Sequence, residues 1–167
     1  MAATSPDESP PRVFFVEAPF GWLKAMTAND ALVSLDVAAP SSAKAIPKDP
    51  LAREVRAQLQ AYFRNPAHRF DLPLRLAGTA FQNRVWRVLQ RIPAGRTRSY
   101  GELADSLTSG PRAVGGACRR NPVMIVVPCH RVVAQTGLGG FMGAVQGRAL
   151  ETKAWLLAHE RKAKLRH

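Results

Sequence analysis

Helix start and stop signals in the middle of the chain constrain its fold more than any other feature. Residues 79–82 and 99–102 each have the spacing of a capping box, in which Thr or Ser is followed three positions later by Gln or Glu. Apolar residues follow the first box at helical period. The segment 108–110 then breaks the second helix, and Pro111 can open a third one that ends near Arg120. Two short helices across a glycine-containing turn predict a helix-turn-helix, although any helical hairpin would have a similar pattern.

The residues before these helices predict a smaller α/β unit. Three short strands, with the turn signal Asn29-Asp30 before the third, precede a helix that begins at Asp49-Pro50 and ends at Asn65-Pro66. The strands are expected at 13–16, 21–26 and 31–37, a loop at 38–49, a helical apolar stripe at Leu51, Val55, Leu59 and Tyr62, and a linker at 70–77. The predicted organisation is a disordered tail at 1–12, an N-terminal α/β domain with its linker at 13–77, and a mainly α-helical domain at 78–167.

The net charge of +12 is concentrated in the second half of the chain. Residues 1–77 hold nine basic and eight acidic residues, whereas residues 78–167 hold fifteen and four. A basic half-chain favours a polyanionic partner, and nucleic acid is the commonest soluble polyanion. A solvated, arginine-rich face would produce the same composition.

The number of cysteines and the hydropathy of the chain argue against a disulfide-rich, zinc-binding, secreted or membrane-spanning protein. The two cysteines, Cys118 and Cys129, are too few for a disulfide framework, and no His/Cys cluster has zinc-ligand spacing, so we expect no metal and no cofactor. The first twelve residues lack the apolar core of a signal peptide, and no apolar run approaches the roughly 20 residues that span a bilayer. These features predict a soluble cytoplasmic protein without a membrane partner, by default a monomer.

Cys129 has the surroundings of a reactive thiol. It precedes His130 and Arg131 and is flanked by two β-branched apolar runs. A neighbouring cation depresses the pKa of a thiol, so we expect a buried, ionised sulfur, although a core cysteine on a strand would look similar. In an extended segment the side chains of Cys129 and His130 would point to opposite faces. Pro128 permits a turn instead, in which His130 would act on the thiol through a water molecule. Glu160 is the candidate for an acid that pairs with His130, although it could equally be a solvated carboxylate at a helix end.

Two further segments carry unusual residues. Small residues lie between arginines at 112–120, and each helical glycine costs about 1 kcal/mol relative to alanine. Close approach of this helix to the sugar-phosphate backbone of a nucleic acid would compensate for the cost of the glycines, and so would close packing against another helix. Glycines then recur from 137 to 147, where backbone can approach a flat ligand. A last helix is expected at 150–160, with Leu150, Ala154 and Leu157 as its apolar stripe.

Several of these segments together resemble the O6-alkylguanine-DNA alkyltransferases, also called methylated-DNA-protein-cysteine methyltransferases. The resemblance covers roughly residues 78–160, whereas the first 77 residues match only in general plan. The matching segments are 78–82, 92–95 with Ser99-Tyr100, 112–117, Asn121-Pro122, 127–133 and 155–160.

The resemblance implies a fold and an activity. The fold would be a ribonuclease-H-like α/β N-terminal domain and a mainly α C-terminal domain with a winged-helix-like helix-turn-helix. The activity would be stoichiometric transfer of the alkyl group from O6-alkylguanine in double-stranded DNA to Cys129, after base flipping and with docking in the minor groove. A thioether cannot be exchanged by a second thiol, so each molecule would act once. A sensor that binds alkylated DNA without chemistry is the alternative, and a thiol hydrolase is a second one.

The resemblance also implies roles for single residues. His130 would deprotonate Cys129 through water, Glu160 would orient His130, Asn121 would hold the active-site turn, and Tyr100 would assist the departing guanine. The predicted DNA contacts are Arg112, which would fill the gap left by the flipped base, with Ala113, Gly115, Gly116, Ala117, Arg119 and Arg120. The predicted base pocket comprises the backbone carbonyl of Val132 and the loop residues Gly140, Phe141, Met142 and Gly143. Met142 departs from the small polar residue that the family commonly has there.

Overall fold

The computed structural model describes residues 10–39, 48–143 and 147–164. Its first elements are the strands β1 (Arg12–Ala18), β2 (Gly21–Ala28) and β3 (Ala31–Ala38), which form an antiparallel sheet in that order. Asn29 and Asp30 between β2 and β3 both have positive φ, the conformation of a tight hairpin turn. The three predicted strands are therefore confirmed. Arg12 belongs to β1 rather than to the predicted tail, whose residues 1–9, like 40–47 of the predicted loop, lie outside the described residues.

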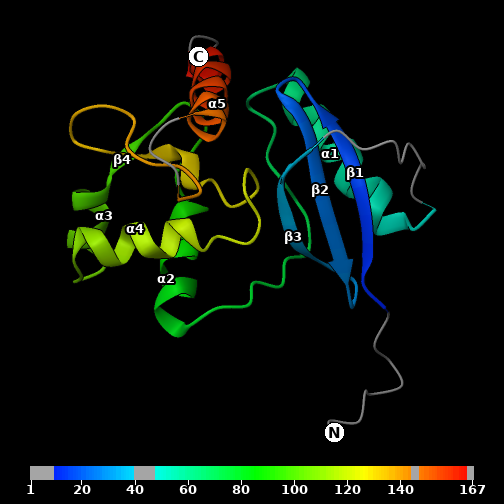
Figure 1. Ribbon diagram of the computed structural model, residues 1–167, viewed down its shortest axis with the longest axis horizontal. Helices are drawn as coiled ribbons and strands as arrows, with labels where there is room; N and C mark the ends of the chain where they lie inside the picture. Colours follow the sequence, from blue (N-terminus) through cyan, green and yellow to red (C-terminus); the bar gives the residue numbers. More distant parts are fainter. Residues whose placement is uncertain (1–9, 40–47, 144–146, 165–167) are drawn as a thin grey trace, which may run out of the picture.

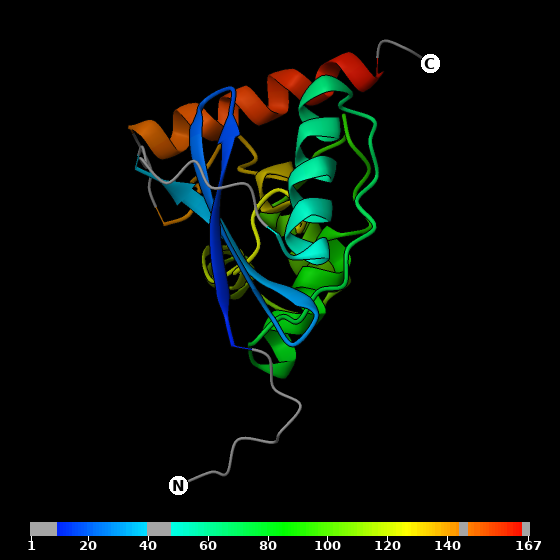
Figure 2. The same cartoon turned by 90° about the vertical axis from the view of Figure 1, so that its right-hand side faces the viewer.

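The helix α1 (Pro50–Arg64) lies beside this sheet (Figure 2). It begins and ends where the sequence predicts, because the Asp49 side chain accepts a hydrogen bond from the Ala52 amide and Asn65 forms the C-cap. Val55, Leu59 and Tyr62 of the predicted stripe are fully buried.

The second half of the chain contains the predicted helix-turn-helix. It consists of α3 (Tyr100–Ser106) and α4 (Pro111–Arg119) across the turn at 107–110, and it follows the helix α2 (Ala80–Leu89); both predicted capping boxes are formed. The short strand β4 (Arg98–Ser99) pairs in parallel with β5 (Val132–Val133), directly after the 3-10 turn η1 (Cys129–Arg131). The fold is therefore mixed α/β, with a small antiparallel sheet and helices.

The last helix, α5 (Arg148–Lys164), runs along one end of the molecule (Figure 2) and lies between its two halves in the view of Figure 1. The predicted apolar stripe is only partly correct, because Leu150 and Ala154 are half-buried. The fully enclosed side chains of α5 include polar ones: Thr152, Lys153, His159 and Glu160 are at most 5% exposed. A helix packed between other elements on several sides buries more than one stripe.

Buried side chains of the two halves form one hydrophobic cluster. Part of the predicted linker is hydrogen-bonded to the sheet, since the Leu32 amide donates to Pro73 O and the Arg75 amide to Leu32 O. The Leu35 backbone likewise bonds to Pro122 and Met124, which lead to the Cys129 turn. The sheet therefore supports the segment that carries the cysteine.

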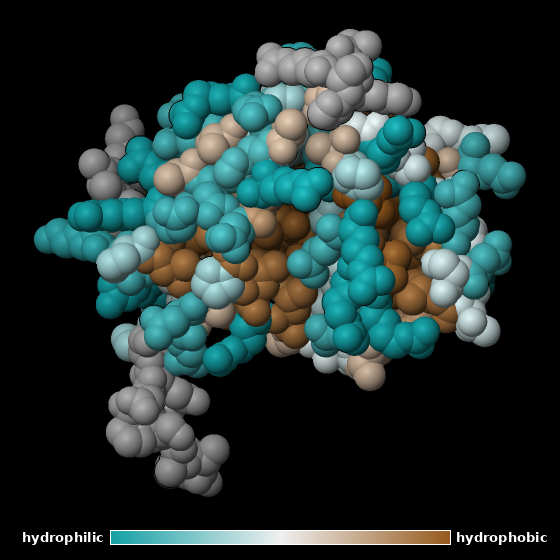
Figure 3. Space-filling view, turned by 180° about the vertical axis from the view of Figure 1, so that it is seen from behind, coloured by the Kyte–Doolittle hydropathy of each residue, from teal (hydrophilic) through white to brown (hydrophobic). Residues whose placement is uncertain are grey.

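The surface opposite the view of Figure 1 is mostly hydrophilic, with apolar side chains visible in patches (Figure 3). Among the helices of the described residues, none has the length and apolarity that crossing a bilayer requires.

Candidate functional site

Cys129 begins η1, directly after Pro128, and its side chain lines a cavity of about 470 Å³. The cavity is bounded by α3, α4, η1 and the 140–143 loop, so it joins segments that are far apart in the sequence. Predicted site residues that line it are Tyr100, Arg112, Gly115, Gly116, Arg119, Cys129, Gly140, Phe141, Met142 and Gly143. A larger cavity of about 630 Å³ lies behind Pro128 and Arg131, but Cys129 does not line it. The chemistry of the thiol therefore belongs to the smaller cavity.

Asn121 holds the turn that leads to Cys129. Its Nδ2 donates to Val127 O at 2.7 Å, and its Oδ1 accepts from the Val123 amide at 3.0 Å. Between these two points Ile125 has a φ of 73°, a conformation that a β-branched residue rarely adopts. The buried side-chain amide of Asn121 therefore bridges the two sides of this turn.

Burial disfavours ionisation of the Cys129 thiol in the free protein. Burial raises the pKa of Cys129 to about 11, although the side chain of Asn121 and the charge of Lys153 act in the opposite direction. The expectation of a depressed pKa is therefore wrong for this state. The neighbours in the sequence, His130 and Arg131, do not lower this pKa, and desolvation disfavours the thiolate more than Asn121 and Lys153 favour it.

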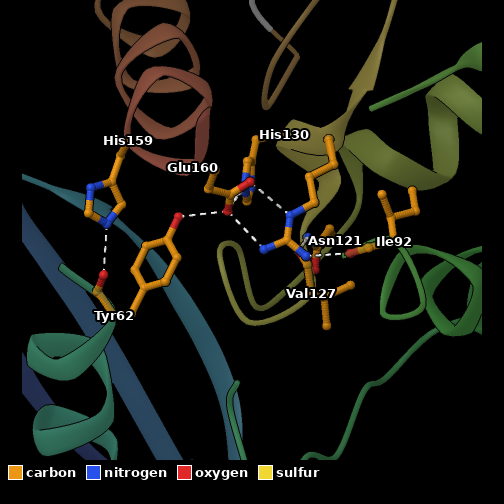
Figure 4. Close-up of polar contacts among 8 residues, drawn as sticks. Tyr62, Ile92, Asn121, Val127, His130, His159 and Glu160 are labelled. Atoms are coloured by element: carbon orange, nitrogen blue, oxygen red, sulfur yellow. Dashed lines mark hydrogen bonds and ion pairs between the residues drawn. The ribbon is translucent and has the colours of Figure 1, made fainter. Parts of the chain in front are cut away.

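Glu160 is the centre of a buried polar network (Figure 4). Its Oε1 lies 2.7 Å from His130 Nε2 and accepts from Arg131 Nη2 and Tyr62 OH, both at 2.8 Å. Burial opposes ionisation, but His130 and Arg131 outweigh it and hold the pKa of Glu160 well below its usual range. The side chain is 1% exposed, so the alternative of a solvated carboxylate is wrong.

His130 has one engaged and one free ring nitrogen. Because Glu160 is ionised, Nε2 carries the proton that bonds to it, and Nδ1 holds a lone pair. Within the described part of the chain, Nδ1 is buried and has no hydrogen-bond partner. Burial lowers the pKa of His130, and the neutral form is the one that can accept a proton.

Lys153 is a site residue that the sequence reasoning missed. Its Nζ donates to Val132 O at 2.7 Å, Leu138 O at 2.6 Å and Gly140 O at 2.9 Å. It therefore ties β5 to the loop that bounds the cavity, and the Val132 carbonyl predicted for ligand binding already accepts one hydrogen bond. The sequence contained a signal for this residue: Lys153 is seven positions before the predicted site residue Glu160, so both lie on the same face of the last helix.

Two residues of the cavity wall, Tyr100 and Arg119, lie against the 140–143 loop. The hydroxyl of Tyr100 donates to Gly140 O at 3.3 Å, and burial, followed by the two cysteines, raises the pKa of Tyr100 to about 12, so it remains a donor. At Gly143 an added Cβ would lie 2.7 Å from Arg119 Nε, which shows that the Arg119 side chain covers the loop.

The outer face of α4 is open. Arg112, Ala113, Gly116, Arg119 and Arg120 are exposed, and a Cβ added at Gly116 would meet nothing within 4 Å. Close packing against another helix therefore does not explain this glycine. The prediction that Ala117 contacts DNA is wrong for its side chain, which is 2% exposed and faces the core, where its carbonyl accepts from Trp86 Nε1 at 2.8 Å.

Comparisons with known proteins agree on one family. The model of the 6-O-methylguanine DNA methyltransferase DNA-binding domain matches residues 80–162. A methylated-DNA–protein-cysteine methyltransferase of Mycolicibacterium paratuberculosis is 50% identical over 108 residues, which are 63% of this chain and 62% of the relative. The constitutive enzyme of that name from Bacillus subtilis is 44% identical over 115 residues, or 67% of each chain. The matched part thus spans about three fifths to two thirds of these relatives.

Solved structures extend the similarity to nearly the whole chain. The O6-methylguanine methyltransferase of Mycobacterium tuberculosis is 35% identical, with a TM-score of 0.76, and the alignment covers 92% of this chain and 94% of that one. A structure of the Mycobacterium tuberculosis protein OGT in complex with DNA has a TM-score of 0.73 at 37% identity, covering 89% and 91%.

Proposed function

The chain belongs to the O6-methylguanine DNA methyltransferase family, and from this premise we propose that it repairs O6-alkylguanine in double-stranded DNA by transferring the alkyl group to Cys129. The observation that carries the proposal is the pairing of two groups on η1. The thiol of Cys129 lines the cavity, and the adjacent His130 is neutral, with Nδ1 free and Nε2 held by Glu160. This combination suits a thiol that is activated only when a substrate is present.

The transfer follows from these positions. Nδ1 of His130 takes the proton of Cys129 through a water molecule while Glu160 stabilises the imidazolium that forms. The sulfur then attacks the alkyl carbon, a carbon–sulfur bond forms, and the carbon–O6 bond breaks. The protonated hydroxyl of Tyr100 supplies a hydrogen bond to the leaving guanine, whose charge develops in the transition state. The product is a thioether, so one molecule repairs one lesion.

The open face of α4 is the proposed DNA-docking surface. Its exposed arginines contact phosphates, and Gly115 and Gly116 let the backbone approach the minor groove. Arg112 occupies the gap left by the flipped nucleotide. Flipping costs on the order of a few kcal/mol, and this cost is lowest for a poorly paired base. The 140–143 loop and the second lone pair of the Val132 carbonyl receive the guanine.

The finer structural assignments are part of this proposal. We take residues 13–77 as a ribonuclease-H-like domain and residues 78–167 as a domain with a winged-helix-like helix-turn-helix that binds DNA and accepts the alkyl group. We also propose that the protein acts in the cytoplasm, on the nucleoid when it is bound to DNA, and that it acts as a monomer, because one α4 surface and one acceptor thiol are enough for the transfer.

The deciding experiment is intact-mass spectrometry after incubation with a duplex that contains one O6-methylguanine. The wild-type protein should gain one methyl group, and Cys129→Ser should gain none. A protein that binds the duplex without a mass change would be a sensor, and one that turns over repeatedly without a mass change would be a hydrolase. Either result would contradict the proposal.

A further inference from the structure

The cavity that holds Cys129 contains a second thiol. Cys118 lies on α4, Cys129 lies on η1, and both side chains line the same cavity of about 470 Å³. Both cysteines are free, and they are 5% and 3% exposed. The proposed alkyl transfer uses only Cys129, so the chemistry of Cys118 is unassigned.

The two sulfurs are close enough to influence each other. Burial raises the pKa of Cys118 to about 12, and a negative charge on Cys129 adds to this effect. The pKa of Tyr100, raised mainly by burial, is raised further by both cysteines, and all three residues line the same cavity. Both thiols are therefore neutral at neutral pH, but only Cys129 is followed by a histidine that can take its proton, so Cys118 does not compete for the first alkyl group. The sulfur of Cys118 remains a nucleophile toward a strong electrophile.

We propose that Cys118 captures the second carbon of a two-carbon bifunctional lesion, such as O6-(2-chloroethyl)guanine, so that an ethylene group bridges the two sulfurs. This inference rests on the proposed function, because alkyl transfer to Cys129 is its first step. Its consequence is that a reactive half-processed adduct is consumed inside the protein and does not attack the bound DNA.

The bonds balance in three steps. Cys129 sulfur attacks the carbon attached to O6, the carbon–oxygen bond breaks, and guanine leaves with the proton of the first thiol. The new thioether sulfur displaces chloride from the neighbouring carbon and forms a three-membered cyclic sulfonium ion. Cys118 sulfur then attacks one ring carbon, one carbon–sulfur bond of the ring breaks, and the proton of the second thiol passes to water. The net products are the bridged protein, guanine, chloride and a proton.

The geometry favours this bridge over a direct disulfide. A disulfide demands a sulfur–sulfur distance of about 2.05 Å and a restricted dihedral angle. Two methylene groups join sulfurs that lie further apart than in a disulfide and add rotatable bonds, so the bridge tolerates more variation in the positions of two neighbouring thiols. Cys118 and Cys129 line one cavity and are almost fully buried, and this enclosure limits the access of water, the main competitor for the sulfonium ion.

The test is intact-mass and peptide mass spectrometry after incubation with a freshly prepared duplex that carries one O6-(2-chloroethyl)guanine. The wild-type protein should gain two carbons and two hydrogens and lose both free thiols, with Cys118 and Cys129 peptides joined. Cys118→Ser and Cys118→Ala should instead carry a hydroxyethyl group on Cys129 or become cross-linked to DNA. The quantity measured is the distribution of products among protein molecules that have already taken up the chloroethyl group. It therefore does not depend on how fast each variant carries out the first transfer.

A parallel incubation with O6-methylguanine duplex separates the two proposals. If no methyl group is transferred, the proposed function fails. If methyl is transferred but the wild-type protein takes up no chloroethyl group, or ends with the same hydroxyethyl or DNA-linked product as Cys118→Ser, the role of Cys118 is overturned.

Discussion

At the scale of single residues, the site depends on buried charges that are compensated by several partners. Glu160 is bonded to three side chains, and Lys153 to three backbone carbonyls. Both residues are on α5, but neither lines the cavity that holds Cys129. They act by holding His130 and the 138–140 backbone in position. Removing a single partner from such a network leaves other buried groups unsatisfied, which costs more than the mean value of one hydrogen bond.

Glu160→Gln should lower both activity and stability. The amide keeps the shape of the side chain but cannot stabilise a protonated His130, and Arg131 loses its ion pair. We expect the single-turnover rate of methyl transfer to fall by about 10²-fold or more, and the free energy of unfolding to fall by about 3–5 kcal/mol. Glu151→Gln, on the exposed side of α5, is the control. Equal transfer rates for the two variants would contradict the role of Glu160.

The contribution of Glu160 to stability should disappear in acid. The pKa of Glu160 is lower in the folded protein than its unfolded value of about 4.3. The unfolded state therefore binds the proton first, and the stabilisation is complete above about pH 4.3 and lost as pH falls below it. In denaturant titrations, the difference between wild type and Glu160→Gln should shrink in this range. A difference that stays constant down to acid unfolding would contradict this assignment.

The reactivity of free Cys129 should reflect its raised pKa. Since that pKa is about 11, alkylation by iodoacetamide should be slow at neutral pH and rise with the thiolate fraction, about tenfold per pH unit between about pH 6 and 8. Cys129→Ser reports the background reaction of Cys118. A rate that reaches a plateau below about pH 8 would show that the thiol is already ionised without substrate.

Lys153→Met should impair transfer through the position of the loop. The substitution removes the donor for the carbonyls of Val132, Leu138 and Gly140 while filling most of the same space. A displacement of about 1 Å at the base pocket can cost on the order of 10² in rate. Lys162→Met, at an exposed position of α5, is the matched control. A single-turnover rate equal to that control would mean that the loop keeps its place without Lys153.

At the scale of elements, α4 combines a buried face with a bare outer face. Its buried side is ordinary packing, with Val114 and Ala117 in the core. The outer side presents Gly116, where an added Cβ would meet nothing within 4 Å, and Gly115 lies beside it at the cavity. Glycine weakens a helix interior, so this face has a cost in stability that docking against DNA would offset.

Substitutions at Gly116 should separate folding from docking. Gly116→Ala should raise the free energy of unfolding by about 0.5–1 kcal/mol, because a Cβ there meets nothing within 4 Å. Gly116→Leu should fold equally well but bind duplex DNA more weakly, since its side chain would hold the helix away from the groove. Thermal melts and DNA titrations at fixed salt measure the two effects. Unchanged DNA affinity of Gly116→Leu would contradict docking through this face.

At the scale of the whole molecule, contacts between distant segments join the two halves. The Tyr62 hydroxyl of α1 bonds to Glu160 across 98 positions, and His159 Nε2 lies 2.7 Å from Tyr62 O. Trp155 of α5 stacks with His159 and packs edge-on against Phe20 and Phe63. The N-terminal half is thereby part of the support for the His130–Glu160 pair.

Tyr62→Phe should destabilise both halves together. It removes one hydrogen bond to a charged group, worth about 1.5–3 kcal/mol. Tryptophan fluorescence and far-UV circular dichroism should report a single unfolding transition that moves to lower denaturant by the same amount. Combining the change with Glu160→Gln should give less than the sum of the two effects, because the residues interact directly. Two separate transitions would show that the halves unfold independently.

The sequence by itself determined the features that arise from neighbouring residues. The Asp49, Thr79 and Ser99 caps and the Asn29-Asp30 turn depend on contacts within a few positions, so their elements were predictable. The ordered motifs around Cys129 were equally sufficient to indicate the family.

Only the tertiary structure decided what depends on burial and on distant partners. The pKa of Cys129 is set by desolvation, which no local pattern records. The contacts of Lys153, the bond from Tyr62 to Glu160 and the meeting of Cys118 with Cys129 in one cavity join segments that are far apart along the chain. Short-range signals specify helices and turns, whereas the packing of those elements determines which side chains meet and how far water is excluded from them.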